Sequence, residues 1–154
     1  MIRVFSTIKI NASADAIWQL INDFGAVCPY RVGFVHCTVE GEGIGALRTL
    51  INSDGGMIIE RLEAQDPNAQ RLSYGLLTDT PFRNCVTTMA LRVLGQNQAE
   101  LEWSATFEAD GLPASEAEEL MGSMLEENCV ALKRVMESNR KEPSRSPLPY
   151  QSER

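Results

Sequence analysis

The chain has 154 residues, of which 44% are hydrophobic and 23% are charged. This length and composition fit one domain with a substantial core and exclude a disordered chain. Lys and Arg number 14 against 21 Asp and Glu, so the net charge of −7 disfavours nucleic acid as a partner. No segment approaches the roughly 18 consecutive apolar residues of a membrane span, and we expect no stable membrane insertion.

The four cysteines are widely spaced and contain no C-x-x-C pair. They are Cys28, Cys37, Cys85 and Cys129. The N-terminus lacks the apolar stretch of a secretory signal, so we expect reduced thiols and a cytoplasmic location. The single histidine, His36, and scattered acids supply no convergent ligand set, so we expect no metal and no cofactor.

The N-terminal third begins with a predicted strand. Residues 3–10 alternate between apolar and polar side chains, as in a half-buried strand. Ser13 fits the N-cap of the helix that follows. Gly25 and Pro29 break the chain into short turns, and we expect two short helices before residue 34.

From Phe34 to Ala109, runs typical of strands alternate with turn signals, which predicts six strands. The turn signals between them are Gly41–Gly45, Asn52–Gly56, Asp66–Ala69, Asp79–Pro81 and Gly95–Asn97. Because sequential strands joined by short turns pair antiparallel, these strands form a meander. With the first strand, the sheet has seven.

A capping box, in which Ser115 is the N-cap and Glu118 the N3 residue, predicts the start of a long helix. Its apolar residues recur every three or four positions as far as Met136, and only this helix is large enough to cover the buried face of the sheet. Prolines, serines and charges follow. We therefore divide the chain into a domain, 1–139, and a flexible tail, 140–154.

Glu60 is a carboxylate in an otherwise apolar row, since it shares a strand face with Ile58, Leu62 and Ala64. Desolvation there is costly without a partner. Arg48 lies nearly opposite on the preceding strand, which favours a structural ion pair over a direct ligand or catalytic role. Both roles are compatible, because Arg48 can also receive a ligand carboxylate or enolate oxygen.

Other polar side chains also face the expected concave side. Asn128 lies on the apolar stripe of the long helix and needs either buried water, backbone or a ligand as its partner. Tyr74 and Thr87 offer hydroxyls to the same space, with core packing the favoured interpretation for Tyr74. His36 and Cys37 are strand neighbours that point to opposite faces, which excludes a nucleophilic pair and favours a surface or rim histidine.

Several short strings carry a family resemblance. They are Ala16-Ile17-Trp18, Asp23-Phe24, Gly45-Ala46-Leu47-Arg48, Glu60-Arg61-Leu62, Leu72-Ser73-Tyr74 and Glu102-Trp103-Ser104. Together they resemble the START-like (SRPBCC) superfamily, which includes Bet v 1-type proteins, small bacterial polyketide cyclase/dehydrase and lipid-transport-like proteins, and plant abscisic-acid receptors. The likeness implies an α+β helix-grip fold, in which a curved seven-stranded antiparallel sheet wraps round the C-terminal helix.

The resemblance also implies an apolar cavity that receives a hydrophobic small molecule of lipid, polyketide or aromatic type. Matched by position to the receptors, it implies ligand-binding roles for Phe34, Arg48, Leu50, Glu60, Tyr74, Cys85, Thr87, Trp103, Leu120, Met124 and Asn128. Val32 stands where the receptors have a pocket lysine, and Cys85 replaces a pocket tyrosine. Their gate sequences are absent, so hormone sensing by gate closure is not expected.

Three functions follow from this reading. The favoured one is binding or carrying of an apolar ligand whose polar end is oriented by Arg48, Glu60, Tyr74 and Asn128. The alternative is a cyclase- or dehydrase-like enzyme in which Glu60 or Tyr74 moves a proton and Arg48 steadies an enolate. The third is an interaction module whose cavity is filled by large side chains such as Trp103.

Overall fold

The computed structural model describes residues 1–78 and 80–145, with side chains through residue 138. In chain order the elements are β1 (Ile2–Ile10), α1 (Ala14–Ile21), the 3-10 turn η1 (Cys28–Tyr30), β2 (Phe34–Glu40), β3 (Leu47–Asn52), β4 (Met57–Asp66), β5 (Arg71–Leu76), β6 (Phe82–Gly95), β7 (Gln98–Ala109) and α2 (Ala114–Arg145). None of the described helices is long and apolar enough to cross a bilayer.

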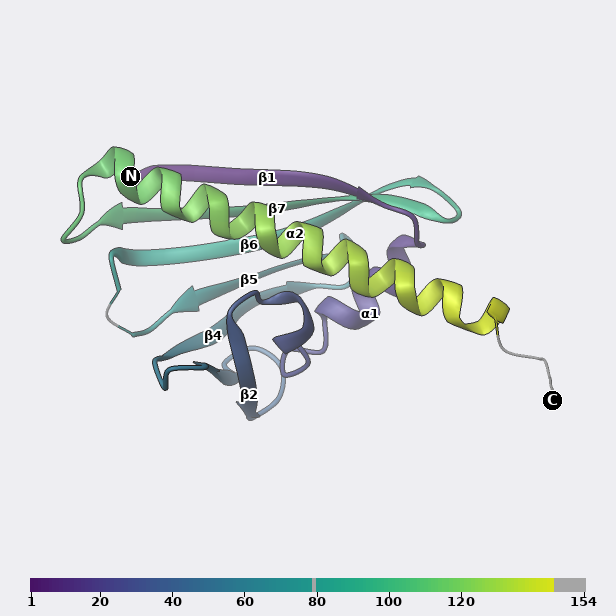
Figure 1. Cartoon of the computed structure of the whole chain (residues 1–154), viewed down its shortest axis with the longest axis horizontal. Coiled ribbons are helices and arrows are strands. Elements are labelled where there is room, and N and C mark those ends of the chain that lie inside the picture. Colours follow the sequence, from purple (N-terminus) through teal and green to yellow (C-terminus); the bar gives the residue numbers. More distant parts are fainter. Residues whose placement is uncertain (79, 146–154) are drawn as a thin grey trace.

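The seven strands form one antiparallel sheet in the order β1-β7-β6-β5-β4-β3-β2. The meander runs from β2 to β7, and β1 pairs with the far edge of β7. The long helix α2 lies across one face of the sheet (Figure 1). This arrangement confirms the predicted α+β helix-grip fold.

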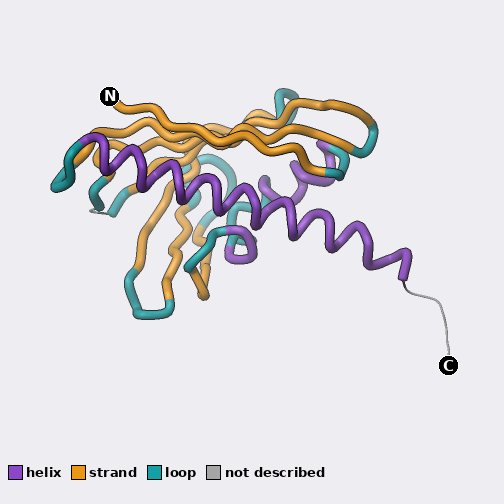
Figure 2. Tube along the Cα trace, turned by 45° about the horizontal axis from the view of Figure 1, so that its top comes forward, coloured by secondary structure: helices purple, strands orange, loops and turns teal. Residues whose placement is uncertain are grey.

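The core lies between α2 and the concave face of the sheet. Figure 2 shows a strongly bent sheet, in which some strands run along α2 and others run across its direction. Trp103, Phe107 and Leu101 on β7 are fully buried, as is Leu132 on α2. Because alternate residues of each strand point inward, β1 and β7 have the regular alternation of burial that the sequence predicts.

The N-terminal helix begins as predicted. The side chain of Ser13 accepts a hydrogen bond of 3.1 Å from the backbone N–H of Ala16 and satisfies one of the free donors of the first turn. Ile17 and Ile21 are buried. The second expected helix is only the three-residue 3-10 turn η1, which has Pro29 in its first turn.

The start of the long helix differs from the prediction. It begins at Ala114, where the carbonyl of Pro113 accepts the N–H groups of Glu116 and Ala117. The carbonyl of the N-cap residue accepts the first bonds of a helix, so Pro113 holds that position. Ser115 lies inside the first turn, and the predicted capping box is wrong.

The end of α2 lies beyond the predicted domain boundary. The helix continues to Arg145, so residues 140–145 of the predicted tail have helical backbone. The remaining residues of that tail, 146–154, lie outside the described residues. The division into a domain, 1–139, and a tail stays a prediction.

A β-bulge breaks the predicted alternation of β4. The register with β5 shifts between Leu62 and Ala64. An extra residue in one strand moves the following side chains to the opposite face. Glu60 and Leu62 are therefore buried as expected, whereas Ala64 is exposed and does not share their face.

The prediction of reduced thiols is wrong for two of the four cysteines. Cys28 and Cys37 form a disulfide that ties η1 to β2, with their Cα atoms 5.9 Å apart. Cys85 and Cys129 are free, and burial raises the pKa of each thiol to about 11. Structural disulfides are rare in reducing cytosol, so the disulfide does not support the predicted cytoplasmic location, which stays a prediction.

We expect the disulfide to stabilise the fold by about 2–3 kcal/mol, since closing a short loop removes entropy from the unfolded chain. Thermal unfolding with and without dithiothreitol measures this, and reduction should lower the midpoint by several degrees. The double variant Cys28→Ser/Cys37→Ser is the matched control. A shift of the same size in that variant would mean that the reductant acts elsewhere.

Candidate functional site

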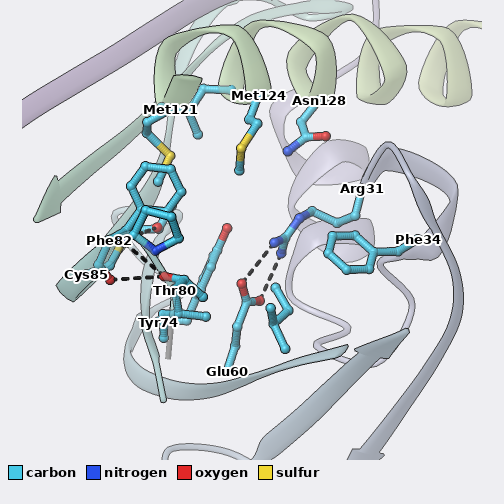
Figure 3. A pocket seen from close by; sticks show the side chains of 15 residues that line it. Arg31, Phe34, Glu60, Tyr74, Thr80, Phe82, Cys85, Met121, Met124 and Asn128 are labelled. Carbon is cyan, nitrogen blue, oxygen red and sulfur yellow. Dashed lines mark hydrogen bonds and ion pairs between the residues drawn. The ribbon is translucent and has the colours of Figure 1, made fainter. Parts of the chain in front are cut away.

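A cavity of about 240 Å³ lies between α2 and the concave face of the sheet (Figure 3). At roughly 30 Å³ for each water molecule, this is room for about eight waters or a small organic ligand. Most of the wall is apolar. Its apolar residues are Phe34, Ile58, Leu76, Pro81, Phe82, Met121, Met124 and Leu125. The polar ones are Arg31, Glu60, Tyr74, Thr80, Cys85, Thr87 and Asn128.

Seven of the eleven sequence-predicted ligand positions line this cavity. They are Phe34, Glu60, Tyr74, Cys85, Thr87, Met124 and Asn128. The other four lie elsewhere. Leu50 and Trp103 are fully buried in the core, Leu120 is 43% exposed on α2, and Arg48 lies buried beside Glu60 without lining the space.

The predicted Arg48–Glu60 ion pair is confirmed, and a second arginine joins it. Arg48 donates from Nε to Oε1 of Glu60 at 2.8 Å. Arg31 donates from both terminal nitrogens to the two carboxylate oxygens, each at 2.9 Å. All three side chains are at most 7% exposed. Glu60 therefore holds a bidentate pair and a third charge-assisted bond at once.

Three segments of the chain bring this cluster together. Arg48 and Glu60 are directly opposite in the β3–β4 register, while Arg31 follows immediately after η1. Arg48 also donates to the carbonyl of Phe24 at 3.1 Å, and its guanidinium lies 4.0 Å from the centroid of the Phe24 ring. The cluster thus fixes the irregular segment between α1 and β2 against the sheet.

Sequence reasoning missed Arg31 because this residue lies in an irregular segment without hydrophobic periodicity. The signal that points to it is the donor capacity of its partner. An ionised carboxylate has about four lone-pair sites, and Arg48 satisfies only one of them on Glu60. A buried carboxylate on an apolar strand face therefore requires further donors.

All three groups of the cluster are charged at neutral pH. Burial alone would raise the pKa of Glu60, but the guanidiniums of Arg31 and Arg48 outweigh that effect and lower it to about 2. Burial likewise opposes the charge of Arg31, and Glu60 more than compensates, so the pKa of Arg31 is raised. Two cations and one anion leave one excess positive charge beside the cavity.

Neutral polar groups complete this wall. Asn128 accepts a hydrogen bond at Oδ1 from the backbone N–H of Val32 at 2.9 Å. The hydroxyl of Tyr74 accepts one from Nε1 of Trp103 at 3.1 Å. Burial raises the pKa of Tyr74, so its phenol stays protonated. Asn128 and Tyr74 each find a protein partner and still face the cavity.

The remaining candidates have structural surroundings. The Sγ atom of Cys85 and the hydroxyl of Thr87 are 3.9 Å apart. His36 is exposed on β2, as expected for a surface histidine, and its neighbour Cys37 is in the disulfide. Within residues 1–78 and 80–138, no three His, Cys, Asp or Glu side chains gather closely enough to hold a metal ion.

A bent seven-stranded sheet packed against one long helix, with a cavity between them, is the arrangement of the START-like superfamily. The family described as polyketide cyclase / dehydrase and lipid transport matches residues 1–137, and the chain belongs to this family. A search of curated proteins finds no match.

Solved structures share the fold over nearly the whole chain. Protein XoxI from Bacillus cereus is 25% identical, with a TM-score of 0.82 over 91% of this chain and 99% of its own. A START superfamily protein from Mycobacterium smegmatis is 19% identical, with a TM-score of 0.76 over 89% and 98%. The Zhui aromatase/cyclase of a Streptomyces species is 18% identical, with a TM-score of 0.74 over 96% and 99%.

We expect Glu60→Gln to lower the free energy of unfolding by roughly 3–5 kcal/mol, because it leaves two buried arginines without a carboxylate. Urea unfolding measures the change. Glu63→Gln, on the same strand, is the control, since its ion pair with Arg61 is partly exposed and contributes about 1 kcal/mol or less. Equal losses in the two variants would contradict the buried cluster.

The cluster also predicts how stability depends on pH. The folded pKa of Glu60, about 2, lies below its ordinary value of 4.5. Its contribution, on the order of 3 kcal/mol, is therefore complete above pH 4.5 and lost as the pH falls toward 2. Urea unfolding between pH 2 and 6 should show the wild type losing its advantage over Glu60→Gln in this window. A constant difference would rule out the depressed pKa.

Proposed function

We propose that this protein binds a hydrophobic small molecule in the cavity between α2 and the sheet. The observation that carries the proposal is a space of about 240 Å³ whose wall is largely apolar, with its charged groups gathered in one cluster. Ligand sites typically combine a hydrophobic wall with a few placed polar groups. Membership of a family that includes lipid transport supports the same function.

Binding is favoured over proton transfer by Glu60. This carboxylate accepts three charge-assisted hydrogen bonds, and its pKa of about 2 leaves it without a proton to donate at neutral pH. A general base with so low a pKa is also weak, because an efficient one titrates near the working pH. The raised pKa of Tyr74 makes that phenol a hydrogen-bond donor and a poor base.

Binding is also favoured over an interaction module with a filled cavity. Of the large side chains that such a module would use, Trp103 and Phe107 are fully buried in the core on β7 and are absent from the cavity wall. The other two, Phe34 and Met124, line the cavity and still leave a space of about 240 Å³. The flexible thioethers of Met121 and Met124 line this space from α2. Methionine adapts well to ligands of irregular shape.

We expect purified protein to bind the neutral fluorescent probe N-phenyl-1-naphthylamine, with a rise in probe emission that saturates. Native mass spectrometry of the same sample, followed by solvent extraction, identifies any molecule carried through purification. The proposal predicts a saturable site or a copurified apolar molecule. Absence of both would overturn it.

The cavity-filling variant Met121→Trp locates the site. Its indole occupies space that the ligand needs, so probe affinity should fall at least ten-fold. Val130→Trp is the control, since Val130 is 46% exposed on the same helix and does not line the cavity. Circular dichroism verifies that both variants fold. If the two variants bind the probe equally well, the probe lies outside the cavity.

A further inference from the structure

The part of the cavity wall formed by Arg31, Glu60 and Asn128 has hydrogen-bond donors left for a ligand. A guanidinium carries five N–H groups, and the two bonds from Arg31 to Glu60 use one on each terminal nitrogen. The other three N–H groups of Arg31 have no hydrogen-bond partner within residues 1–78 and 80–138. The acceptor oxygens of Glu60 already receive three bonds from Arg31 and Arg48, so the cluster presents donors to a ligand.

Asn128 presents donors beside Arg31. Its Oδ1 atom accepts the backbone N–H of Val32. Because that partner is a donor, the acceptor must be the amide oxygen, and the NH₂ end is the one left for the cavity. Figure 3 shows the amide nitrogen of Asn128 turned toward the cavity, above Arg31. Since Val32 directly follows Arg31, this bond also holds the two side chains near each other.

The excess positive charge of the Arg31–Arg48–Glu60 cluster favours a negatively charged acceptor group on the ligand. Among the described residues, Glu60 is the one carboxylate that forms an ion pair with Arg31 or Arg48, so one positive charge is not neutralised. In a largely apolar enclosure, an anion is attracted more strongly than in water. A carboxylate has only acceptors and matches the planar N–H edge of a guanidinium.

We propose that the ligand is a small hydrophobic carboxylic acid, bound as its anion, with the carboxylate between the guanidinium of Arg31 and the amide of Asn128. This rests on the proposed function. The apolar body lies against residues such as Phe82, Met121 and Leu125. Arg31 and Asn128 select the acid, and the remaining wall sets the size and shape of its hydrocarbon part.

The test compares octanoate with 1-octanol, which have the same chain length and differ in the charged end. Displacement of N-phenyl-1-naphthylamine at pH 7 gives both affinities. We expect octanoate to bind the wild type at least ten-fold more tightly than the alcohol. Equal affinity, or preference for the alcohol, would overturn the proposal, and this comparison needs no variant.

Asn128→Asp tests the proposed carboxylate site. The substitution keeps an oxygen for the N–H of Val32 and replaces the donor end with a second, negatively charged oxygen. We expect octanoate affinity to fall at least ten-fold while octanol affinity changes less than two-fold. Thr87→Val, which removes a hydroxyl elsewhere in the cavity, is the control and should change both affinities by the same factor.

Different outcomes overturn the proposed function and the acid assignment. If the probe and octanol bind in the cavity and octanoate does not, the ligand is apolar and only the acid assignment fails. If the probe, octanol and octanoate all fail to bind and no apolar molecule copurifies, the proposed function fails together with the acid assignment. If Asn128→Asp lowers the affinities for octanoate and octanol equally, Asn128 shapes the cavity and does not bind the carboxylate, which contradicts the proposed carboxylate site.

Discussion

The rest of the site depends on the ion pairs that Arg31 and Arg48 form with the carboxylate of Glu60. This carboxylate accepts hydrogen bonds from Arg31 and Arg48, and Arg48 in turn donates to the carbonyl of Phe24. An uncompensated buried charge costs several kcal/mol. The chain segments that carry Arg31, Arg48 and Glu60 therefore stabilise one another's positions. The segment between α1 and β2 has little regular structure. The ion cluster and the Cys28–Cys37 disulfide hold it against the sheet, where a strand would be held by backbone hydrogen bonds.

The same cluster gives the cavity its chemical character. Because Arg31 and Glu60 form part of the wall, the charged groups lie together on one part of it, and the rest of the wall is apolar or carries only neutral polar groups. The pKa of about 2 for Glu60, and the permanent charge of both arginines, keep this polarity constant across the neutral pH range. In the proposed function, this wall orients the ligand by fixed charges and fixed donors, without taking up or releasing a proton.

The predictable part of this site lies on regular elements. Alternation along neighbouring strands placed Arg48 opposite Glu60, and helical spacing placed Asn128 on the inward face of α2. The number of strands and their antiparallel order followed from turn signals, since short connections leave few topologies. In each case the repeat of the element determines where a side chain points, and this repeat is two residues in a strand and 3.6 residues in a helix.

The features that the sequence did not predict depend on contacts between distant segments or on the insertion of one residue into a strand. The bulge after Leu62 reverses the direction of Ala64, and the partner of Cys28 is one of three other cysteines, none distinguished by its local sequence. Arg31 lies 29 positions from Glu60 in a segment without a period. The requirement for further donors was nevertheless present in the sequence, because the single bond from Arg48 leaves most lone pairs of the buried carboxylate without a partner. Counting donors against acceptors for each polar residue on an apolar face therefore predicts that more donors reach Glu60, and the tertiary structure shows that a second arginine supplies them.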